Sequence, residues 1–203
     1  MITMIDYGLG NLRSVQKALE FVGASVQLTA DPALVRAAAK LVLPGVGAFG
    51  AGIAALHARG LANAIREAVG RGTPILGICL GMQFLFDESS EMGRHQGLGL
   101  LPGRVVRFPH NGLPVPHMGW NQVQHNGTHP LLTGVPAGAY AYFVHSYYCQ
   151  PANPADLIAT TDYGQPIAAI TGRGHILGIQ FHPEKSQQTG LRILHNFHKM
   201  TTA

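Results

Sequence analysis

Two segments built from apolar residues place the strongest constraint on the fold of this chain. "LVLPG" at residues 41–45 and "PILGIC" at residues 74–79 contain no charged or amide side chain. A strand buried on both faces has such a continuous apolar sequence, whereas a strand with one face in water alternates apolar and polar residues. Strands of the first kind are typical of parallel sheets that helices cover on both sides. We therefore expect both segments to be central strands of an α/β domain.

The rest of the N-terminal half alternates between strand and helix patterns. The apolar segment "MITMI" ends before Gly8, and Leu12, Val15 and Leu19 then follow at helical spacing. Alanine-rich sequence between residues 51 and 70 has the composition of short helices. This order of strands and helices predicts a mainly parallel sheet.

The C-terminal half has a different texture. From about residue 100, β-rich segments such as "GRVVRF" and "AYAYFVHSYYC" are separated by Gly, Pro and Asn turns, and a helix at 189–200 follows. We expect a three-layer α/β fold, with a mainly parallel central sheet flanked by helices and an antiparallel β portion in the C-terminal half. Because no low-complexity linker interrupts the chain, residues 1–203 are expected to form a single domain.

Composition and charge argue against several classes of protein. The chain has 203 residues, 46% hydrophobic and 12% charged, which suits one compact domain with a sizeable core. No apolar stretch reaches 18 residues and the N-terminus lacks the layout of a signal peptide, so we expect a cytoplasmic protein with no membrane partner. The net charge is +4, but the 14 Lys and Arg residues are scattered singly, which argues against a nucleic-acid partner. With 2 cysteines and no nucleotide-binding motif, we expect no metal and no other cofactor.

One of these cysteines lies between two glycines at the end of the second apolar segment. "GICLG" places Cys79 after a strand and before the helical segment "MQFLFDE", with Gly77 and Gly81 each two positions away. This is the context of a nucleophile elbow, with cysteine in place of serine. The start of a helix favours the thiolate, and the backbone N–H of Leu80 is placed to face an oxyanion. The alternative is a small buried cysteine that packs where the strand meets the helix.

The sequence "GIQFHPEKS" provides a candidate base. His182 follows an apolar strand that Pro183 stops, so it lies at the carboxyl edge of the sheet, where α/β proteins bind ligands. Glu184 is two residues further on, and positions i and i+2 of an extended backbone face the same side. These residues predict a triad with Cys79 as nucleophile, His182 as base and Glu184 as the group that orients the imidazole. The alternative is a solvated turn after a strand.

A glycine-rich loop follows the first apolar segment. "LPGVGAFGAG" at residues 43–52 has neither the spacing of a dinucleotide fingerprint nor the Gly-Lys-Ser/Thr of a P-loop. Its backbone amides lie at the carboxyl end of a neighbouring strand, where they could supply a second oxyanion donor and dock a small polar substrate. The alternative is a plain turn between strand and helix.

Three of these segments together resemble a known family. "LPGVGAFG", "GICLGMQFLF" and "GIQFHPEKS", in this order, resemble the class I glutamine amidotransferases, and the resemblance spans nearly the whole chain. Within that family, "IDYGLGNLRSVQKAL", "PHMGWNQV" and "YFVHSYY" resemble the glutaminase subunits of imidazole glycerol phosphate synthase, which act in histidine biosynthesis. The resemblance implies that Cys79 attacks the side-chain amide of L-glutamine and forms a glutamyl thioester with release of ammonia. It also implies that His182 transfers the protons and that Glu184 orients it.

The resemblance assigns further residues to the same site. The backbone N–H of Leu80 and one from Val46 or Gly47 would stabilise the oxyanion. A second set of residues would hold the amino and carboxylate groups of glutamine: Gly47, Gln83, Ser146 and Tyr147.

The resemblance also implies a partner. A (βα)8-barrel cyclase subunit would form a heterodimer with this chain, receive its ammonia through a channel, and make imidazole glycerol phosphate and an aminoimidazole carboxamide ribotide. Asn11, Trp120 and Lys185 match positions at or near that interface. From the residues alone, Trp120 is equally well interpreted as a core aromatic and Lys185 as a solvated charge.

Three alternative functions stay open at this point. The chain resembles, less closely, the glutaminases that serve anthranilate, carbamoyl phosphate, guanylate or pyridoxal phosphate synthesis. An elbow cysteine by itself indicates acyl transfer and not which acyl group, so a general cysteine hydrolase or peptidase fits the chemistry. A catalytically silent scaffold that only binds a partner is the third alternative, against which the intact triad argues.

Overall fold

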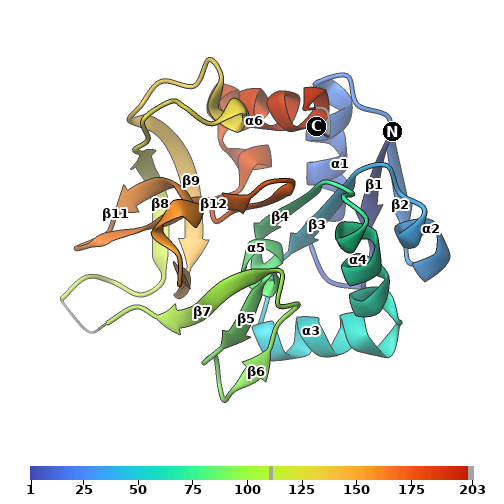
Figure 1. Ribbon diagram of the computed structural model, residues 1–203. Helices are drawn as coiled ribbons and strands as arrows, with labels where there is room; N and C mark the ends of the chain where they lie inside the picture. The colour runs from blue at the N-terminus through green and yellow to red at the C-terminus, as the bar shows by residue number, and fades with distance from the viewer. Residues whose placement is uncertain (110–111, 201–203) are drawn as a thin grey trace.

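The protein is described by a computed structural model that covers residues 1–109 and 112–200. A seven-stranded sheet forms its centre, with strand order β11-β12-β13-β4-β3-β1-β2 (Figure 1). The five strands from β13 to β2 are parallel, and β12 and β11 continue the sheet antiparallel at one edge. The bounds of these strands are β1 (Ile2–Ile5), β2 (Val26–Thr29), β3 (Leu41–Gly45), β4 (Ile75–Cys79), β11 (Leu157–Asp162), β12 (Pro166–Arg173) and β13 (Ile176–Ile179). The two apolar segments are thus adjacent central strands, β3 and β4, and both are buried throughout.

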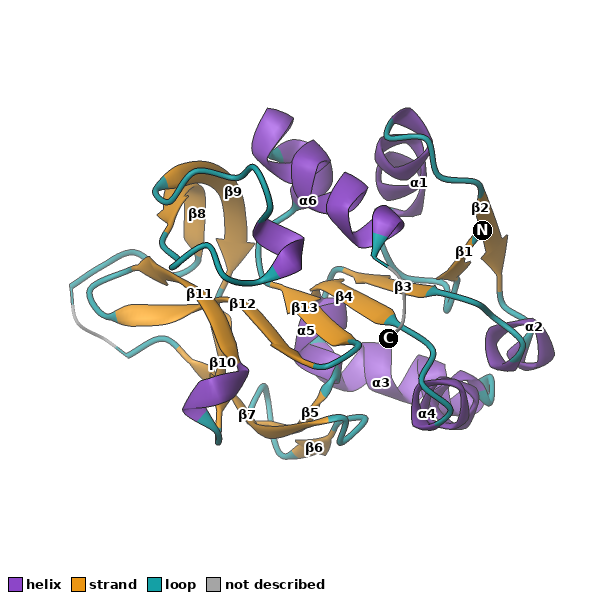
Figure 2. Ribbon diagram, turned by 45° about the horizontal axis from the view of Figure 1, so that its top comes forward, coloured by secondary structure: helices purple, strands orange, loops and turns teal. Residues whose placement is uncertain are grey.

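Helices cover both faces of this sheet and form two separate hydrophobic cores (Figure 2). On one face lie α1 (Leu12–Phe21) and α6 (Gln187–Lys199). On the other lie α2 (Pro32–Arg36), α3 (Phe49–Ala58) and α4 (Leu61–Gly70). The predicted three-layer α/β class is confirmed by this arrangement. Within residues 1–109 and 112–200, no helix is long and apolar enough to cross a membrane.

Two smaller sheets flank the central one. A four-stranded sheet has the order β10-β7-β5-β6, and β8 pairs with β9 in an antiparallel hairpin. These strands supply the antiparallel portion expected from the C-terminal half, although β5 and β7 run parallel. Their bounds are β5 (Phe86–Ser89), β6 (His95–Gln96), β7 (Leu101–Arg107), β8 (His117–Val123), β9 (Ala139–His145) and β10 (Tyr147–Pro151).

One local prediction is wrong. The segment "MQFLFDE" was expected to be helical throughout, but helix α5 (Leu80–Phe84) is short and β5 begins at Phe86. The carbonyl oxygens of Phe84 and Phe86 accept hydrogen bonds from Leu98 and Gly99, and Phe86 pairs with Leu101 in the second sheet. A short apolar run has the same appearance in a buried helix and a buried strand, so only these distant partners decide the switch.

Candidate active site

Cys79 is the last residue of β4 and the N-cap of α5, and its backbone is strained. Its φ of 55° and ψ of −111° lie where residues other than glycine are rarely found. The flanking glycines make this turn possible, because a Cβ on Gly81 would overlap the carbonyl oxygen of Leu43. A Cβ on Gly77 would lie 2.5 Å from the carbonyl oxygen of Gly81. Such conformations cost about 1–3 kcal/mol and are concentrated at functional sites.

His182 and Glu184 form a buried pair beside this turn. The Nδ1 of His182 lies 2.9 Å from Oε1 of Glu184, and the two side chains are 5% and 1% exposed. The expectation of an extended backbone from His182 to Glu184 is wrong. Residues Pro183–Lys185 form a 3-10 turn rather than an extended segment, and this turn folds the Glu184 carboxylate back onto the imidazole.

The protonation of His182 depends on both of its neighbours. Burial lowers the pKa of His182, but hydrogen bonds with Cys79 and Glu184, and the charges of those two groups, outweigh burial and raise the pKa to about 10. At neutral pH the His182 ring is therefore an imidazolium, and it can give one of its two N–H protons to a leaving group. The sulfur of Cys79 and the imidazole of His182 lie in the wall of the same cavity.

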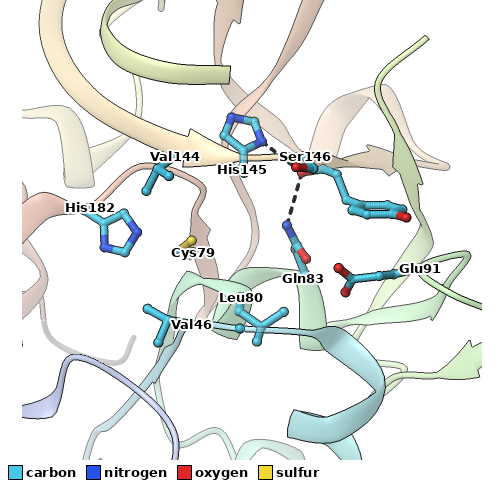
Figure 3. Close-up of a pocket in the computed structure, with 11 residues that line it drawn as sticks. Val46, Cys79, Leu80, Gln83, Glu91, Val144, His145, Ser146 and His182 are labelled. Carbon is cyan, nitrogen blue, oxygen red and sulfur yellow. Dashed lines mark hydrogen bonds between the residues drawn. The ribbon is translucent and has the colours of Figure 1, made fainter. Parts of the chain in front are cut away.

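These groups open into a cavity of about 210 Å³ (Figure 3). All the residues expected for the nucleophile, base, oxyanion and substrate sites line this cavity, and Glu184 lies behind His182. Its lining consists of Val46, Gly47, Cys79, Leu80, Gln83, Glu91, Val144, His145, Ser146, Tyr147 and His182.

The glycine-rich loop forms one wall of the cavity. Gly47 has a φ of +100°, which favours glycine, and the loop continues directly into α3. Leu80, at the start of α5, lies near Val46 in the same wall (Figure 3). The structure therefore brings both expected sources of oxyanion donors to the side of the cavity that holds Cys79.

Comparison with known proteins agrees with this geometry. The family described as "Glutamine amidotransferase class-I" matches residues 3–200. The chain belongs to the class-I glutamine amidotransferases. It is therefore a glutamine-hydrolysing enzyme by family.

Individual relatives carry more specific names. A protein of Syntrophotalea carbinolica named "Imidazole glycerol phosphate synthase subunit HisH" is 53% identical, over 98% of this chain and 100% of its own length. A protein of Salinibacter ruber with the same name is 50% identical, over 100% of this chain and 95% of its own. A crystal structure of a glutamine amidotransferase shares the fold with a TM-score of 0.77 at 17% identity, covering 98% of this chain and 100% of that one.

Sequence reasoning missed three residues of this amidotransferase site. Gln180 Nε2 lies 3.9 Å from the sulfur of Cys79, and Gln180 Oε1 accepts a hydrogen bond from Gln83. Gln180 lies two positions before His182, and residues i and i+2 of an extended backbone face the same side. This spacing could have identified Gln180 from the sequence. His145 lies inside "YFVHSYY", next to the expected Ser146 and Tyr147, and could have been found there. Glu91 had no such signal, because a turn brings it to the cavity.

Glu91 contributes a carboxylate to the cavity wall opposite the triad (Figure 3). Its Oε2 accepts a hydrogen bond of 2.5 Å from the backbone N–H of Phe49, the first residue of α3. A negative charge is thereby held between the substrate cavity and the helix that the glycine-rich loop enters.

The three expected interface residues lie in different settings. Asn11 is half-buried and donates a hydrogen bond to Glu184 Oε1 at 3.3 Å, so it contacts the triad directly. Trp120 is 47% exposed on β8, so its interpretation as a core aromatic is wrong. The Trp120 ring packs edge-on against the Tyr142 ring, with 6.0 Å between the centroids. Lys185 is exposed, and its ammonium nitrogen lies 5.7 Å from the centroid of the same Tyr142 ring. Trp120 and Lys185 therefore form one exposed surface beside His182 and Glu184.

Proposed function

We propose that this chain is the glutaminase subunit of an imidazole glycerol phosphate synthase. The observation that carries the proposal is Cys79, held in a strained turn and lining one cavity with His182, which is itself paired with Glu184. Two relatives are 50% to 53% identical over nearly the whole chain, and both are named as subunits of imidazole glycerol phosphate synthase. These names support this synthase over other class-I amidotransferases.

The reaction begins with the Cys79 sulfur as a thiolate beside the protonated imidazole of His182. The thiolate attacks the side-chain amide carbon of glutamine, and the tetrahedral intermediate collapses to a γ-glutamyl thioester as His182 gives its proton to the departing ammonia. Water then attacks the thioester with the neutral His182 as base, which releases glutamate and restores the thiolate and the protonated imidazole. Glu184 holds the ring by its Nδ1, so that Nε2 is left for these proton transfers.

The developing negative charge needs donors on the side of Cys79. We assign this role to the backbone N–H of Leu80 and to one from the Val46–Gly47 segment. Loss of one such donor costs about 10²–10³ in kcat, so the orientation of a single peptide in the glycine-rich loop would control turnover.

The opposite end of the cavity suits the charged end of glutamine. We assign the α-ammonium group to Glu91 and to the side-chain oxygen of Gln83, whose nitrogen is already used to donate to Tyr147 O at 3.2 Å. The main chain of Gly47 and of Ser146–Tyr147 is left for the α-carboxylate. With the charged end of glutamine held there, its side-chain amide would lie beside Cys79.

Ammonia must reach its acceptor without entering water, where it becomes protonated and stops being a nucleophile. We propose that a (βα)8-barrel cyclase subunit covers the exposed surface around Trp120 and Lys185 and receives the ammonia. The edge of this surface at Lys185 is one residue from Glu184, so the partner would lie against the triad.

The test is glutamate release from L-glutamine by the purified chain, alone and with the cyclase subunit and its ribotide substrate. We expect release to rise by at least tenfold in the complete mixture, because the partner completes the site. Equal release by the chain alone would contradict the partner proposal and leave the amidotransferase chemistry standing. No release in any mixture would contradict both.

A further inference from the structure

Two buried histidines take no part in the proposed proton transfers, and one of them, His145, lines the cavity. His117 begins β8 and His145 ends β9, and the two residues are direct partners in the hairpin. They are 3% and 6% exposed, and Nδ1 of His117 lies 3.0 Å from Nε2 of His145. A pair of buried imidazoles in contact needs an explanation, because each ring nitrogen must find a partner of the right kind.

The hydrogen-bond partners of His145 Nδ1 and His117 Nε2 fix the direction of every hydrogen bond between the two rings and their neighbours. His145 Nδ1 lies 2.8 Å from the carbonyl oxygen of Tyr147, which can only accept, so this nitrogen carries the hydrogen. His145 Nε2 then accepts from Nδ1 of His117, and the remaining Nε2 of His117 must accept as well. It does so from the amide nitrogen of Asn121, at 3.2 Å.

The orientation of the Asn121 amide is fixed independently. Its nitrogen also donates to the carbonyl oxygen of Asp162 at 2.7 Å, and its oxygen accepts from the backbone N–H of Gln122 at 2.8 Å. Hydrogen bonds therefore run in one direction, from Asn121 through His117 and His145 to the carbonyl of Tyr147. An extra proton on either ring would leave two donors facing each other.

The Tyr147 carbonyl is where this relay meets the active site. It accepts from His145 and also from Gln83 Nε2, which fills both lone pairs. Gln83 in turn donates to Gln180, and Gln180 to the sulfur of Cys79. The relay and the Gln83 amide thus converge on one backbone oxygen in the wall of the cavity, and the other hydrogen bonds from Gln83 run away from it toward Cys79.

The surroundings of the pair favour neutral rings. The ring of His117 stacks against Phe143 and Tyr163, with centroids 4.9 Å and 4.1 Å away. Burial lowers the pKa of His117 to about 4. Burial also lowers the pKa of His145, to about 3; its hydrogen bond to Tyr147 opposes this shift and the charges of His117 and His182 add to it.

Few charged groups face the pair from neighbouring elements. His182 lies across the cavity from His145, and Tyr163 stacks on His117. Asp162 accepts from Asn121 through its main-chain oxygen. The carboxylate of Asp162 accepts from the N–H of Gly164. None of these contacts supplies a carboxylate that would stabilise an imidazolium, and the Glu91 carboxylate in the same cavity accepts from the backbone N–H of Phe49 instead.

We propose that His117 and His145 are positioning residues of the glutaminase reaction, which hold the Tyr147 carbonyl, and with it Gln83, through a one-directional relay of neutral imidazoles. This inference rests on the proposed function, because the wall that it positions is the assigned glutamine site. It predicts that both rings carry their hydrogen on Nδ1.

The first test reads the tautomers directly. Long-range ¹⁵N–¹H correlation spectra of the ¹⁵N-histidine-labelled full chain are expected to show Nδ1–H and bare Nε2 for His117 and His145 from pH 6 to 9. Assignment comes from single His→Asn variants. Nε2–H on either ring, or titration of either ring in this range, would overturn the relay whatever the activity of the protein.

The second test uses turnover, under the conditions in which the wild-type chain hydrolyses glutamine. His145→Asn keeps a donor near the position of Nδ1 and should raise KM for glutamine less than threefold, whereas His145→Leu should raise it at least tenfold. Equal effects of the two variants, with equal melting temperatures, would overturn the proposal.

Asn121→Asp replaces the donor that starts the relay by an acceptor. We expect KM relative to wild type to rise about tenfold at pH 8.5 and to recover as pH falls to 6, because an added proton on the new carboxylate or on His117 restores the direction. Asn121→Leu is the control, with a loss that does not change with pH. An Asn121→Asp effect that is also independent of pH would contradict the relay, and an inactive wild-type chain would instead contradict the proposed function.

Discussion

At the scale of single residues, the site depends on how Glu184 controls the imidazole next to it. Removing its charge by Glu184→Gln should lower the pKa of His182, which burial otherwise depresses and which Cys79 and Glu184 together raise to about 10. In the wild type the imidazolium is lost only as pH rises through about 10, so in the variant it is lost at lower pH. We expect kcat to fall by roughly two to four orders of magnitude and the alkaline limb of kcat/KM to move to lower pH.

The measurement is a pH profile of glutamate release from pH 6 to 10.5. Glu67→Gln is the matched control, because this carboxylate is 49% exposed and pairs with Arg36 far from the cavity. An alkaline limb at the same pH in Glu184→Gln and wild type would show that Glu184 does not set the protonation of His182.

Sequence reasoning located residues whose role is encoded by local chain geometry. Cys79 was found from its flanking glycines, and His182 and Glu184 from the end of a strand. Glu91 was not found, since it comes from a turn after β5, and neither was the contact of His145 with His117, 28 positions earlier. Contacts between distant segments leave no local pattern in a single sequence.

At the scale of elements, the turn from β4 to α5 depends on close backbone approach. A Cβ at Gly81 would overlap the Leu43 carbonyl in β3, so Gly81→Ala must push α5 away from the sheet. We expect a loss of about 1–3 kcal/mol in the free energy of unfolding and loss of turnover as Cys79 and Leu80 shift. Thermal or urea unfolding, together with glutamate release, measures both effects.

Gly70→Ala is the control for this change. Gly70 ends α4, and a Cβ there would meet nothing within 4 Å. Alanine is the better helix former by about 1 kcal/mol, so we expect this variant to be as stable as the wild type or slightly more stable. Equal stability of the two variants would contradict the close-packed elbow.

The order of strands and helices in the N-terminal half followed from helical spacing and from continuous apolar runs, because β1, β3 and β4 are buried along their whole length. The end of α5 did not follow, since Phe86 leaves the helix to pair with β7. The end of α5 and the contact of His145 with His117 were missed for the same physical reason, because in each case the partner is distant in the sequence.

At the scale of the whole molecule, the β8–β9 hairpin presents apolar side chains to solvent next to the triad. Met118, Trp120 and Tyr140 are 66%, 47% and 56% exposed. Large aromatic residues of this kind often carry much of an interface's binding energy. We expect Trp120→Ala to weaken binding of the cyclase subunit by roughly 10- to 30-fold, as measured by calorimetry, with little change in the melting temperature of the free chain.

Phe21→Ala provides the comparison. This aromatic is 76% exposed at the C-terminal end of α1, away from the hairpin. Equal weakening by both changes, or by neither, would place the partner on a different face of the molecule.

The central claim is that Cys79 is the nucleophile, and the chain provides its own control for this claim. Cys79 and Cys149 are both free and buried, but only Cys79 lines the cavity with His182. The most direct measurement is glutamate release by Cys79→Ala and Cys149→Ala, each checked for folding by its melting temperature. We predict a loss of roughly four orders of magnitude or more in Cys79→Ala and a change of less than about threefold in Cys149→Ala. Turnover that persists in a folded Cys79→Ala variant would contradict the account.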